Sequence, residues 1–541
     1  MKFFNRNLLW ISVLAAVTQQ NAIAGSTSMV SVNAQQIVGN SDSYDASLSN
    51  GGVAVAFESS ATNLAQGDGN RAKDVFLKSG GKTLTRISVN SLGQEGFNSA
   101  SSWGSSNNYA DSGSPSISAD GKLVVFQSNA DNLDLLTQDT NNDTNNGKET
   151  DIFLRDVAKK KTYRLSGIMD GADNVITPDL KDAKNQPLVK ADAPWKILTE
   201  ANDASTNPVI AGTLKAGVVA FESKATNLSP LTTTANIRNI YIIDLKTKKI
   251  ELISAIHDPE TGAPTDQARD ATPAAVDSFN PALSPDGRFV AFQSRATNLV
   301  SGVSDTAKTD IFLYDRITFR MYQLSGALSA AAPFSVTAEG NGDSGNASIT
   351  GGGKSKSYLI AFDSTATNLD SVPGGDTGSD LDVFVVEFKS GTSTVPNDPL
   401  SVGEILSVKR ISGPVDANGN VTEEARRDGS GTSGSAAPVI AGSNTAYTVA
   451  FHSIADNLLA DTLDIFWNED SNQKADIYVY DSKTRLFSRA NVDAGGEQGS
   501  VDAIRPSLSP DGKAVGFETR DDYLVPFFGD NNNSQVYLRK R

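Results

Sequence analysis

The sequence predicts an all-β protein, a seven-bladed β-propeller of four-stranded antiparallel blades. Three observations lead to this prediction: one unit recurs seven times, each copy holds four short β-prone segments, and the two ends of the chain can combine into a complete unit. The composition agrees. Of the 541 residues, 38% are hydrophobic, 20% are charged and 45 are Gly, which is typical of a turn-rich β protein rather than a disordered chain.

The repeat is clearest in three stretches, which read PSISADGKLVVFQSNADNL at 115–133, PALSPDGRFVAFQSRATNL at 281–299 and PSLSPDGKAVGFETRDDYL at 506–524. Four weaker copies share the central Phe, the polar residue after it and a turn of the Ala-Thr-Asn-Leu type. An apolar segment follows, usually opened by Asp. The seven anchoring residues are Phe57, Phe126, Phe221, Phe292, Phe362, Phe451 and Phe517.

Each copy divides into four strands, here called a to d. In the fourth copy these are Pro281–Ser284, Phe289–Ser294, Asp310–Asp315 and Met321–Ser325. Strands a and b are joined by a Pro-Asp-Gly turn, where Gly287 tolerates a positive φ. Strand b is apolar on both faces, so it needs burial from both sides. A sheet stacked radially between two neighbours provides that burial, which predicts a propeller.

The chain ends predict how the ring closes. The seventh copy has no strand d, because only three residues follow Val536–Leu538. Residues Ser26–Gln35 resemble Leu84–Gly93, which form the strand d region of the first copy. We therefore expect Ser26–Gln35 to pair beside Val536–Leu538 as the outermost strand of the last blade.

The first 24 residues are typical of a secretory signal peptide. Lys2 and Arg6 precede the apolar run Leu8–Val17, and small residues lead up to Ala24, after which we expect cleavage. The mature chain, residues 25–541, is then a single propeller domain located in the periplasm or secreted.

Charge and cysteine content exclude several classes of function. The net charge of −16 disfavours nucleic acid as a partner. The absence of Cys excludes disulfides and Cys-based catalysis or metal binding. No later segment approaches eighteen apolar residues, so we expect no membrane span. The remaining expectation is a monomer whose partner is a protein or a glycan.

The motif Ser-Pro/Ala-Asp-Gly-Lys/Arg-x-Val-x-Phe stands at Ser118–Phe126, Ser284–Phe292 and Ser509–Phe517. Together with the Asp-Ile-Phe/Tyr strand, it resembles the WD40-like Asp-Gly repeat of the TolB-like β-propeller family. The resemblance is closer to secreted bacterial propellers with Ala-Thr-Asn-Leu turns. It implies a propeller fold. TolB-like proteins carry an α/β domain before the propeller, whereas here the first copy starts soon after the signal, so the resemblance does not imply the Tol role.

Catalytic motifs are missing. The two His residues, His257 and His452, lie outside any G-x-S-x-G or H-E-x-x-H pattern. His452 occupies a repeat position, the polar residue after each anchoring Phe, which we expect to satisfy backbone groups. The Asn of the Ala-Thr-Asn-Leu turn suits a left-handed backbone conformation, and its Leu is expected to pack between blades. We therefore name no catalytic residue.

The loop between strands b and c carries the most specific chemical pattern. The candidate metal ligands are Asp68, Asn70 and Asp74 in the first copy, Asp376, Asp380 and Asp382 in the fifth, and Asp470, Asn472 and Asp476 in the sixth; the second copy has Asp139, Asn141, Asp143 and Asn145 before Asp151. Carboxylate and amide oxygens suit Ca²⁺, so Ca²⁺ is a candidate cofactor. Asp- and Asn-rich turns also form without metal, and both interpretations stay open.

The b–c and d–a loops emerge on one face of a propeller, and we expect the long segments 168–204 and 391–406 there. Trp103, Trp195 and Trp467 are the ligand candidates on this face, with loop packing as the alternative. The favoured function is a non-enzymatic binding or scaffold protein that recognises a protein or glycan on this face. The alternatives are a polysaccharide lyase or hydrolase acting at the central channel, and a surface or matrix structural component.

Overall fold

A computed structural model gives the fold of the chain. It describes residues 25–97, 110–137, 139, 142–143, 147–169, 185, 192–270, 272, 274–303, 308–329, 335–369, 380–414, 421–422, 426–427, 431–432, 434–459, 472–525 and 532–541. The expected signal peptide lies outside these residues. Within them, no helix is long and apolar enough to cross a membrane.

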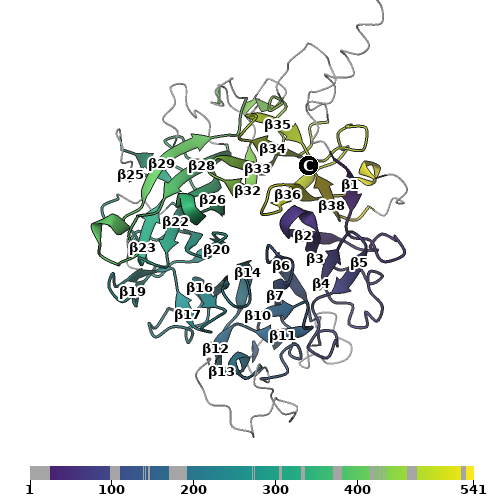
Figure 1. Cartoon of the computed structure of the whole chain (residues 1–541), viewed down its shortest axis with the longest axis horizontal. Helices are drawn as coiled ribbons and strands as arrows, with labels where there is room; N and C mark the ends of the chain where they lie inside the picture. The colour runs from purple at the N-terminus through teal and green to yellow at the C-terminus, as the bar shows by residue number, and fades with distance from the viewer. Residues whose placement is uncertain are drawn as a thin grey trace, which may run out of the picture.

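Seven four-stranded antiparallel sheets stand around a central axis, which confirms the predicted seven-bladed propeller (Figure 1). From the axis outward, blade 1 holds β2 (Ser43–Leu48), β3 (Ala54–Ser59), β4 (Asp74–Ser79) and β5 (Thr83–Arg86). Blade 2 holds β6 (Ser112–Ile117), β7 (Leu123–Ser128), β10 (Asp151–Asp156) and β11 (Lys161–Arg164). Blade 3 holds β14 (Ser205–Ala211), β15 (Val218–Ser223), β16 (Asn239–Asp244) and β17 (Ile250–Leu252).

The other four blades repeat this order. Blade 4 holds β20 (Ser278–Leu283), β21 (Phe289–Ser294), β22 (Asp310–Asp315) and β23 (Arg320–Gln323). Blade 5 holds β26 (Ser344–Gly351), β27 (Ser357–Ser364), β28 (Asp382–Lys389) and β29 (Glu404–Arg410). Blade 6 holds β32 (Ser435–Ser443), β33 (Ala446–Ser453), β34 (Asp476–Asp481) and β35 (Leu486–Arg489). Blade 7 holds β36 (Ala503–Leu508), β37 (Ala514–Thr519), β38 (Gln535–Lys540) and β1 (Thr27–Met29).

The core of every blade is built on the anchoring Phe. All seven anchors are fully buried, and each pairs across the sheet with an aromatic residue of the third strand. In blade 4, for example, the rings of Phe292 and Phe312 stack with their centroids 5.7 Å apart. The Leu of the Ala-Thr-Asn-Leu turn is buried in each of the seven blades, as expected. The repeated motif therefore encodes the contact between neighbouring sheets.

The predicted closure is confirmed. Strand β1 pairs antiparallel with β38, with Thr27 opposite Arg539 and Met29 opposite Tyr537. The pairing continues beyond β1, since the backbone N–H of Val30 donates to the carbonyl of Val536 at 2.8 Å. In Figure 1 the purple start of the chain thus lies beside its yellow end.

Two expectations about loops are wrong. Residues 390–403 join β28 to β29, so this segment is a c–d connection on the face opposite the b–c loops. The Asn of the Ala-Thr-Asn-Leu turn does not adopt a left-handed conformation. Its amide instead clamps the d–a loop: Asn63 accepts from the N–H of Asn40 and donates to the carbonyl of Val38. A side chain that satisfies two backbone groups of another loop explains the recurrence without any special φ.

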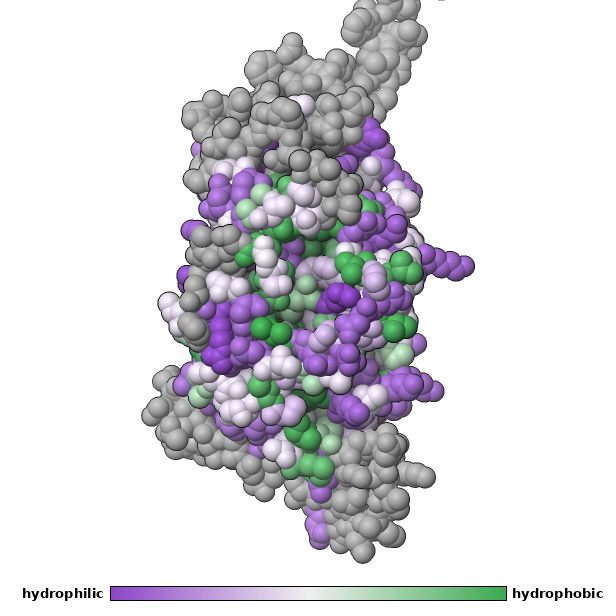
Figure 2. Space-filling model, turned by 90° about the vertical axis from the view of Figure 1, so that its left-hand side faces the viewer, coloured by the Kyte–Doolittle hydropathy of each residue, from purple (hydrophilic) through white to green (hydrophobic). Residues whose placement is uncertain are grey.

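The d–a connections of blades 2, 3 and 4 extend as short two-stranded ribbons. These are β12 (Gly167–Met169) with β13 (Ile197–Glu200), β18 (Ala255–His257) with β19 (Pro264–Gln267), and β24 (Gly326–Leu328) with β25 (Val336–Glu339). The outer edge of the ring mixes polar side chains with scattered apolar ones, as Figure 2 shows for the side of the molecule that lies at the left of Figure 1.

Candidate functional site

Each innermost strand contains a β-bulge close to the face where the b–c and d–a loops emerge. The register between the first two strands shifts at the same place in all seven blades, for example between Phe279 and Ala282 in blade 4. One residue of each bulge has a φ of 48° to 52°, in the left-handed region: Asp45, Ser114, Asn207, Asn280, Asn346, Ala437 and Arg505. A bulge re-aims a side chain, and here it aims seven side chains at the channel.

The polar residue after each anchoring Phe holds these bulges in place. Its side chain accepts the backbone N–H of the bulge residue in the next blade: Glu58 from Ser114 at 2.8 Å, Gln127 from Asn207 at 2.9 Å, Glu222 from Asn280 at 2.8 Å, Asp363 from Ala437 at 2.8 Å and Glu518 from Asp45 at 2.5 Å. For these five residues the expected role, satisfying backbone groups, is confirmed. The same bonds join five pairs of neighbouring blades.

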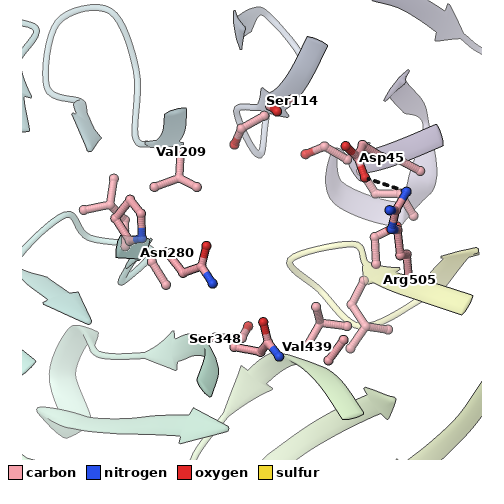
Figure 3. Close-up of a pocket in the computed structure, with 18 of the residues that line it drawn as sticks. Asp45, Ser114, Val209, Asn280, Ser348, Val439 and Arg505 are labelled. Atoms are coloured by element: carbon pink, nitrogen blue, oxygen red, sulfur yellow. Dashed lines mark ion pairs between the residues drawn. The ribbon is translucent and has the colours of Figure 1, made fainter. Parts of the chain in front are cut away.

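The bulges line the mouth of a central channel with a volume of about 590 Å³. Figure 3 shows side chains from different blades directed toward this space, among them Asp45, Ser114, Asn280 and Arg505. Deeper in the channel the lining changes to small and aliphatic residues, such as Ser348 and Val439. The channel therefore has a polar mouth and a mostly apolar wall.

Three amides of the mouth are fixed in orientation. Asn207, Asn280 and Asn346 each donate Nδ2 to the polar residue that follows Phe in their own blade, at distances of 2.6 to 2.8 Å. Among the described residues, no hydrogen bond reaches the Oδ1 atoms of Asn207 and Asn346, and both side chains are exposed. These carbonyl oxygens are preoriented acceptors at the mouth.

The charged side of the mouth lies where blade 7 meets blade 1. Nη1 of Arg505 is 3.6 Å from Oδ1 of Asp45 and 3.4 Å from Oε2 of Glu518, and Lys73 binds Glu58 at 2.7 Å. Burial raises the pKa of Glu518 to about 7, and it also raises the pKa of Asp45. Glu518 has no exposed surface, however, whereas Asp45, Arg505 and Lys73 of this group face solvent.

His452 is the residue after the anchoring Phe of blade 6, the position that Glu518 occupies in blade 7. Its Nδ1 is buried and has no hydrogen-bond partner among the described residues, and burial lowers its pKa. The other histidine, His257, bonds the carbonyl of Leu252 at 2.8 Å and packs on the ring of Tyr314. Neither imidazole lies next to a nucleophile and a carboxylate in the described part of the chain.

The predicted metal loop of blade 1 surrounds an arginine. The guanidinium of Arg86 lies 3.1 Å from Asp74, 4.0 Å from Asp68 and 2.8 Å from Glu95, and its side chain is buried. Burial raises the pKa of Asp74 to about 6. Asn70 uses its amide within the loop region, donating to the carbonyl of Gly96 and accepting from the N–H of Ala72. Two of the three predicted ligands, Asp68 and Asp74, thus lie beside one cation, which is the guanidinium of Arg86 on strand d.

Blades 5 and 6 repeat the arrangement. Arg410 binds Asp382 at 3.2 Å, and Arg489 binds Asp476 at 2.8 Å. Asn472, like Asn70, bonds backbone groups, the carbonyl of Gly499 and the N–H of Lys474. Asp380 is half-buried beside strand β28. The predicted ligands Asp376 and Asp470 lie outside the described residues.

Among the described residues, blade 2 has the largest excess of carboxylates around its arginine. Arg164 is buried among Asp134 at 3.8 Å, Asp139 at 3.9 Å, Asp151 at 3.0 Å and Glu200, which it contacts most closely. The ligand atoms of Asp139, Asp151 and Glu200 lie within 4.8 Å of one another, a spacing that could hold a metal ion. Burial raises the pKa of Asp134 to about 6 and also raises that of Asp151.

The sequence contains a signal for these arginines. Arg is the last residue of strand d in blades 1, 2, 5 and 6, in the segments TRIS, YRLS, KRIS and SRAN, and these are the blades with the acidic b–c loops. In blades 3, 4 and 7 the position holds Leu252, Gln323 and Met29. The loop acids and the arginine therefore occur together within the chain.

Of the three Trp candidates, the described residues include only Trp195. Its indole is 5% exposed and stacks on Tyr163, with ring centroids 4.7 Å apart. It follows residues 170–192 and lies next to the c–d turns of blades 2 and 3. Trp103 and Trp467 lie outside the described residues.

Comparison with known proteins found similarity among solved structures but not among family models or curated proteins. No family model and no curated protein matches the chain. Among solved structures, an oligogalacturonate lyase from Vibrio parahaemolyticus has 11% identity and a TM-score of 0.36, covering 96% of this chain and 97% of that one. An oligogalacturonate lyase in complex with manganese has 12% identity and a TM-score of 0.35, covering 91% and 88%. TolB from Acinetobacter baumannii has 13% identity and a TM-score of 0.28, covering 73% and 77%. Scores of this size carry no argument about function.

Proposed function

We propose that this protein is a non-enzymatic binding propeller that recognises a glycan at the mouth of its central channel, on the face of the b–c loops. The observation that carries this proposal is the ring of seven bulge residues, six of which present a polar side chain to one space. Sugar hydroxyl groups both donate and accept hydrogen bonds. The mouth offers acceptors in its amide oxygens and Asp45, and donors in Ser114 and Arg505.

The fixed geometry of the mouth supports binding. The amides of Asn207, Asn280 and Asn346 are held by their own blades, and the backbone under most of the ring is held by the neighbouring blade. Groups that are already ordered lose little entropy when a ligand arrives, so more of the contact energy contributes to affinity. The scaffold therefore preorganises a polar site on rigid strands.

The test is a glycan array probed with the protein and with the triple variant Asn207→Ala, Asn280→Ala, Asn346→Ala. Ala437 occupies the same bulge position with a φ of 52°, so alanine is accommodated in this ring. The matched control is Asn397→Ala, because Asn397 is exposed, has a φ of 63° and lies in a c–d connection away from the channel. We expect saturable binding to a glycan class that the triple variant loses and the control keeps. Binding that the triple variant keeps would contradict the proposal.

The second candidate, a polysaccharide hydrolase or lyase in the channel, is favoured by one observation. Glu518, whose pKa is raised to about 7, contacts the backbone of Asp45, and a carboxyl that is protonated near neutral pH can act as a general acid. The burial of Glu518 disfavours this role, because the acid must reach the scissile bond. Incubating the bound glycan with the protein distinguishes the two functions: new chain ends that Asp45→Asn abolishes would indicate the enzyme.

We also infer that the repeat is of the TolB-like kind, on the strength of the Asp-Gly motif at Ser118–Phe126, Ser284–Phe292 and Ser509–Phe517. We further propose that residues 1–24 are removed on export and that residues 25–541 act as a monomer in the periplasm or outside the cell. Mass spectrometry of the exported protein would give an N-terminus at Gly25, and light scattering would give the mass of one chain.

For the cofactor, we propose Ca²⁺ at the acidic b–c loops. Blade 2 offers the best charge balance for a divalent cation, because four carboxylates there face one arginine. In blades 1 and 6 the guanidinium already neutralises much of the carboxylate charge, which weakens the case for a metal at Asp68 and Asp476.

A further inference from the structure

Lysines gather where blades 2 and 3 meet, on the face opposite the b–c loops. Three turns contribute them: the c–d turn of blade 2, the a–b turn of blade 3 and the c–d turn of blade 3. The lysines are Lys159, Lys160, Lys161, Lys215, Lys246, Lys248 and Lys249. In a protein with a net charge of −16, such a cluster is a local reversal of charge. Blades 2 and 3 lie side by side at the bottom of Figure 1.

The turns enclose a hollow with a volume of about 370 Å³. Four of the lysines line it, together with Tyr163, Trp195 and Asp192: these are Lys159, Lys161, Lys215 and Lys248. Two of the four have carboxylate partners. Lys161 binds Asp192 at 3.1 Å, and Lys159 binds Asp156 at 3.2 Å.

The other two lysines, Lys215 and Lys248, make no ion pair within the described residues. The ammonium group of Lys248 lies 3.6 Å from the centre of the Trp195 ring and donates to the carbonyl of Leu245. Tyr163 backs the indole by stacking on it. The cation is therefore held at the edge of the hollow by an aromatic face and a neutral oxygen rather than by a carboxylate.

This arrangement leaves the ammonium group of Lys248 partly desolvated and without a salt-bridge partner within the described residues. Lys248 is half-buried, and burial lowers the pKa of its ammonium group to about 8, although the carboxylate of Asp244 opposes that shift. An anion entering the hollow would supply the missing partner for Lys248 and Lys215 at once. Attraction between opposite charges is stronger at a partly buried site than in open water.

We propose that this hollow binds an oxyanion, a sulfate, phosphate or carboxylate group, either as a free ion or carried on an acidic polysaccharide. Lys248 and Lys215 contact the anion, and Trp195 and Tyr163 position Lys248. The site is separate from the channel mouth, because its lysines come from turns at the opposite end of the strands and none of its lining residues lines the channel.

The first experiment is titration calorimetry with inorganic sulfate and phosphate, at constant ionic strength balanced with chloride. We expect saturable binding to the protein and at least tenfold weaker binding to the double variant Lys215→Gln, Lys248→Gln. Lys215 is exposed, so the single variant Lys215→Gln, which we expect to bind several-fold more weakly, covers the case in which Lys248→Gln disturbs folding. The matched control is Lys483→Gln, because Lys483 lies in the corresponding c–d turn of another blade, blade 6, outside the hollow.

The second arm distinguishes the sources of the anion by using dextran sulfate, with neutral dextran as the control. Dextran sulfate that binds more than tenfold tighter per sulfate than the free ion indicates a polymer ligand, and equal affinity indicates a free ion. Both results support the site if the double variant loses them. The proposal is overturned if neither anion nor polymer binds saturably, or if the double variant and Lys483→Gln bind as well as the parent protein.

Discussion

Closure of the ring by β1 predicts that damage to this short strand destabilises the whole propeller. Met29, Val30 and Val32 are 7%, 3% and 2% exposed. Burial of one such side chain contributes about 1.5–3 kcal/mol, so the three contribute on the order of 5–9 kcal/mol before the entropy of ordering the segment is subtracted. A domain of ordinary stability has about 5–15 kcal/mol in total. Deleting residues 25–36 should therefore leave little net stability, and the exposed edge of β38 should promote aggregation.

A point variant tests the same contact with less disruption. Val30→Asp removes a buried side chain and places a carboxyl group in its position, which should lower the free energy of unfolding by at least about 3 kcal/mol. Ile37→Asp is the matched control, because Ile37 directly follows this segment and is 55% exposed. Urea denaturation gives the free energies, and light scattering detects aggregates. A Val30→Asp variant that unfolds with the parent protein and stays monomeric would refute closure by this strand.

Three further predictions follow from buried groups. Phe292→Ala should cost about 3–5 kcal/mol in urea denaturation, because the ring is fully buried against Phe312; a loss below about 1 kcal/mol would contradict this. The pKa of Glu518 is raised from 4.5 to about 7, so the folded state binds the proton more tightly and stability should fall by on the order of 3 kcal/mol as pH rises from 4.5 to 7. Glu518→Gln should flatten this part of the pH profile, and an unchanged profile would refute the assignment. Millimolar Ca²⁺ should raise the melting temperature of the chelator-treated protein, and Asp139→Asn should remove the rise. If Ca²⁺ leaves the melting temperature unchanged, Arg164 alone balances the carboxylates around it, and the metal site is contradicted.

The repeat anchors made the fold predictable. A buried Phe in the second strand and a buried Leu in the turn after it recur in all seven copies, and an Asp opens the third strand in five of them. The closing strand was predictable because Ser26–Gln35 copies the pattern of Leu84–Gly93. Such signals are local in the sequence and repeat seven times, so chance variation in one copy does not hide them.

The mouth of the channel was not predictable in the same way. The bulge in the first strand depends on how that strand pairs with the second, and residues as different as Asp45, Asn280, Ala437 and Arg505 adopt the same φ. The arginine of the acidic clusters was missed because it lies on strand d, distant in sequence from the b–c loop whose acids it neutralises. Sequence spacing shows which acids share a loop, whereas the cation that joins them comes from another strand.

Protection of the channel mouth by a bound glycan is the most direct test of the proposed function. The protein has no Cys, so Asn280→Cys introduces a single thiol at the mouth and Asn397→Cys introduces one at a c–d connection away from it. The measurement is the rate of maleimide labelling of each variant, with and without a saturating amount of the glycan found on the array. We predict that the glycan slows labelling of Asn280→Cys at least tenfold and leaves Asn397→Cys unchanged. Equal labelling rates of Asn280→Cys with and without bound glycan would contradict a ligand site in the channel.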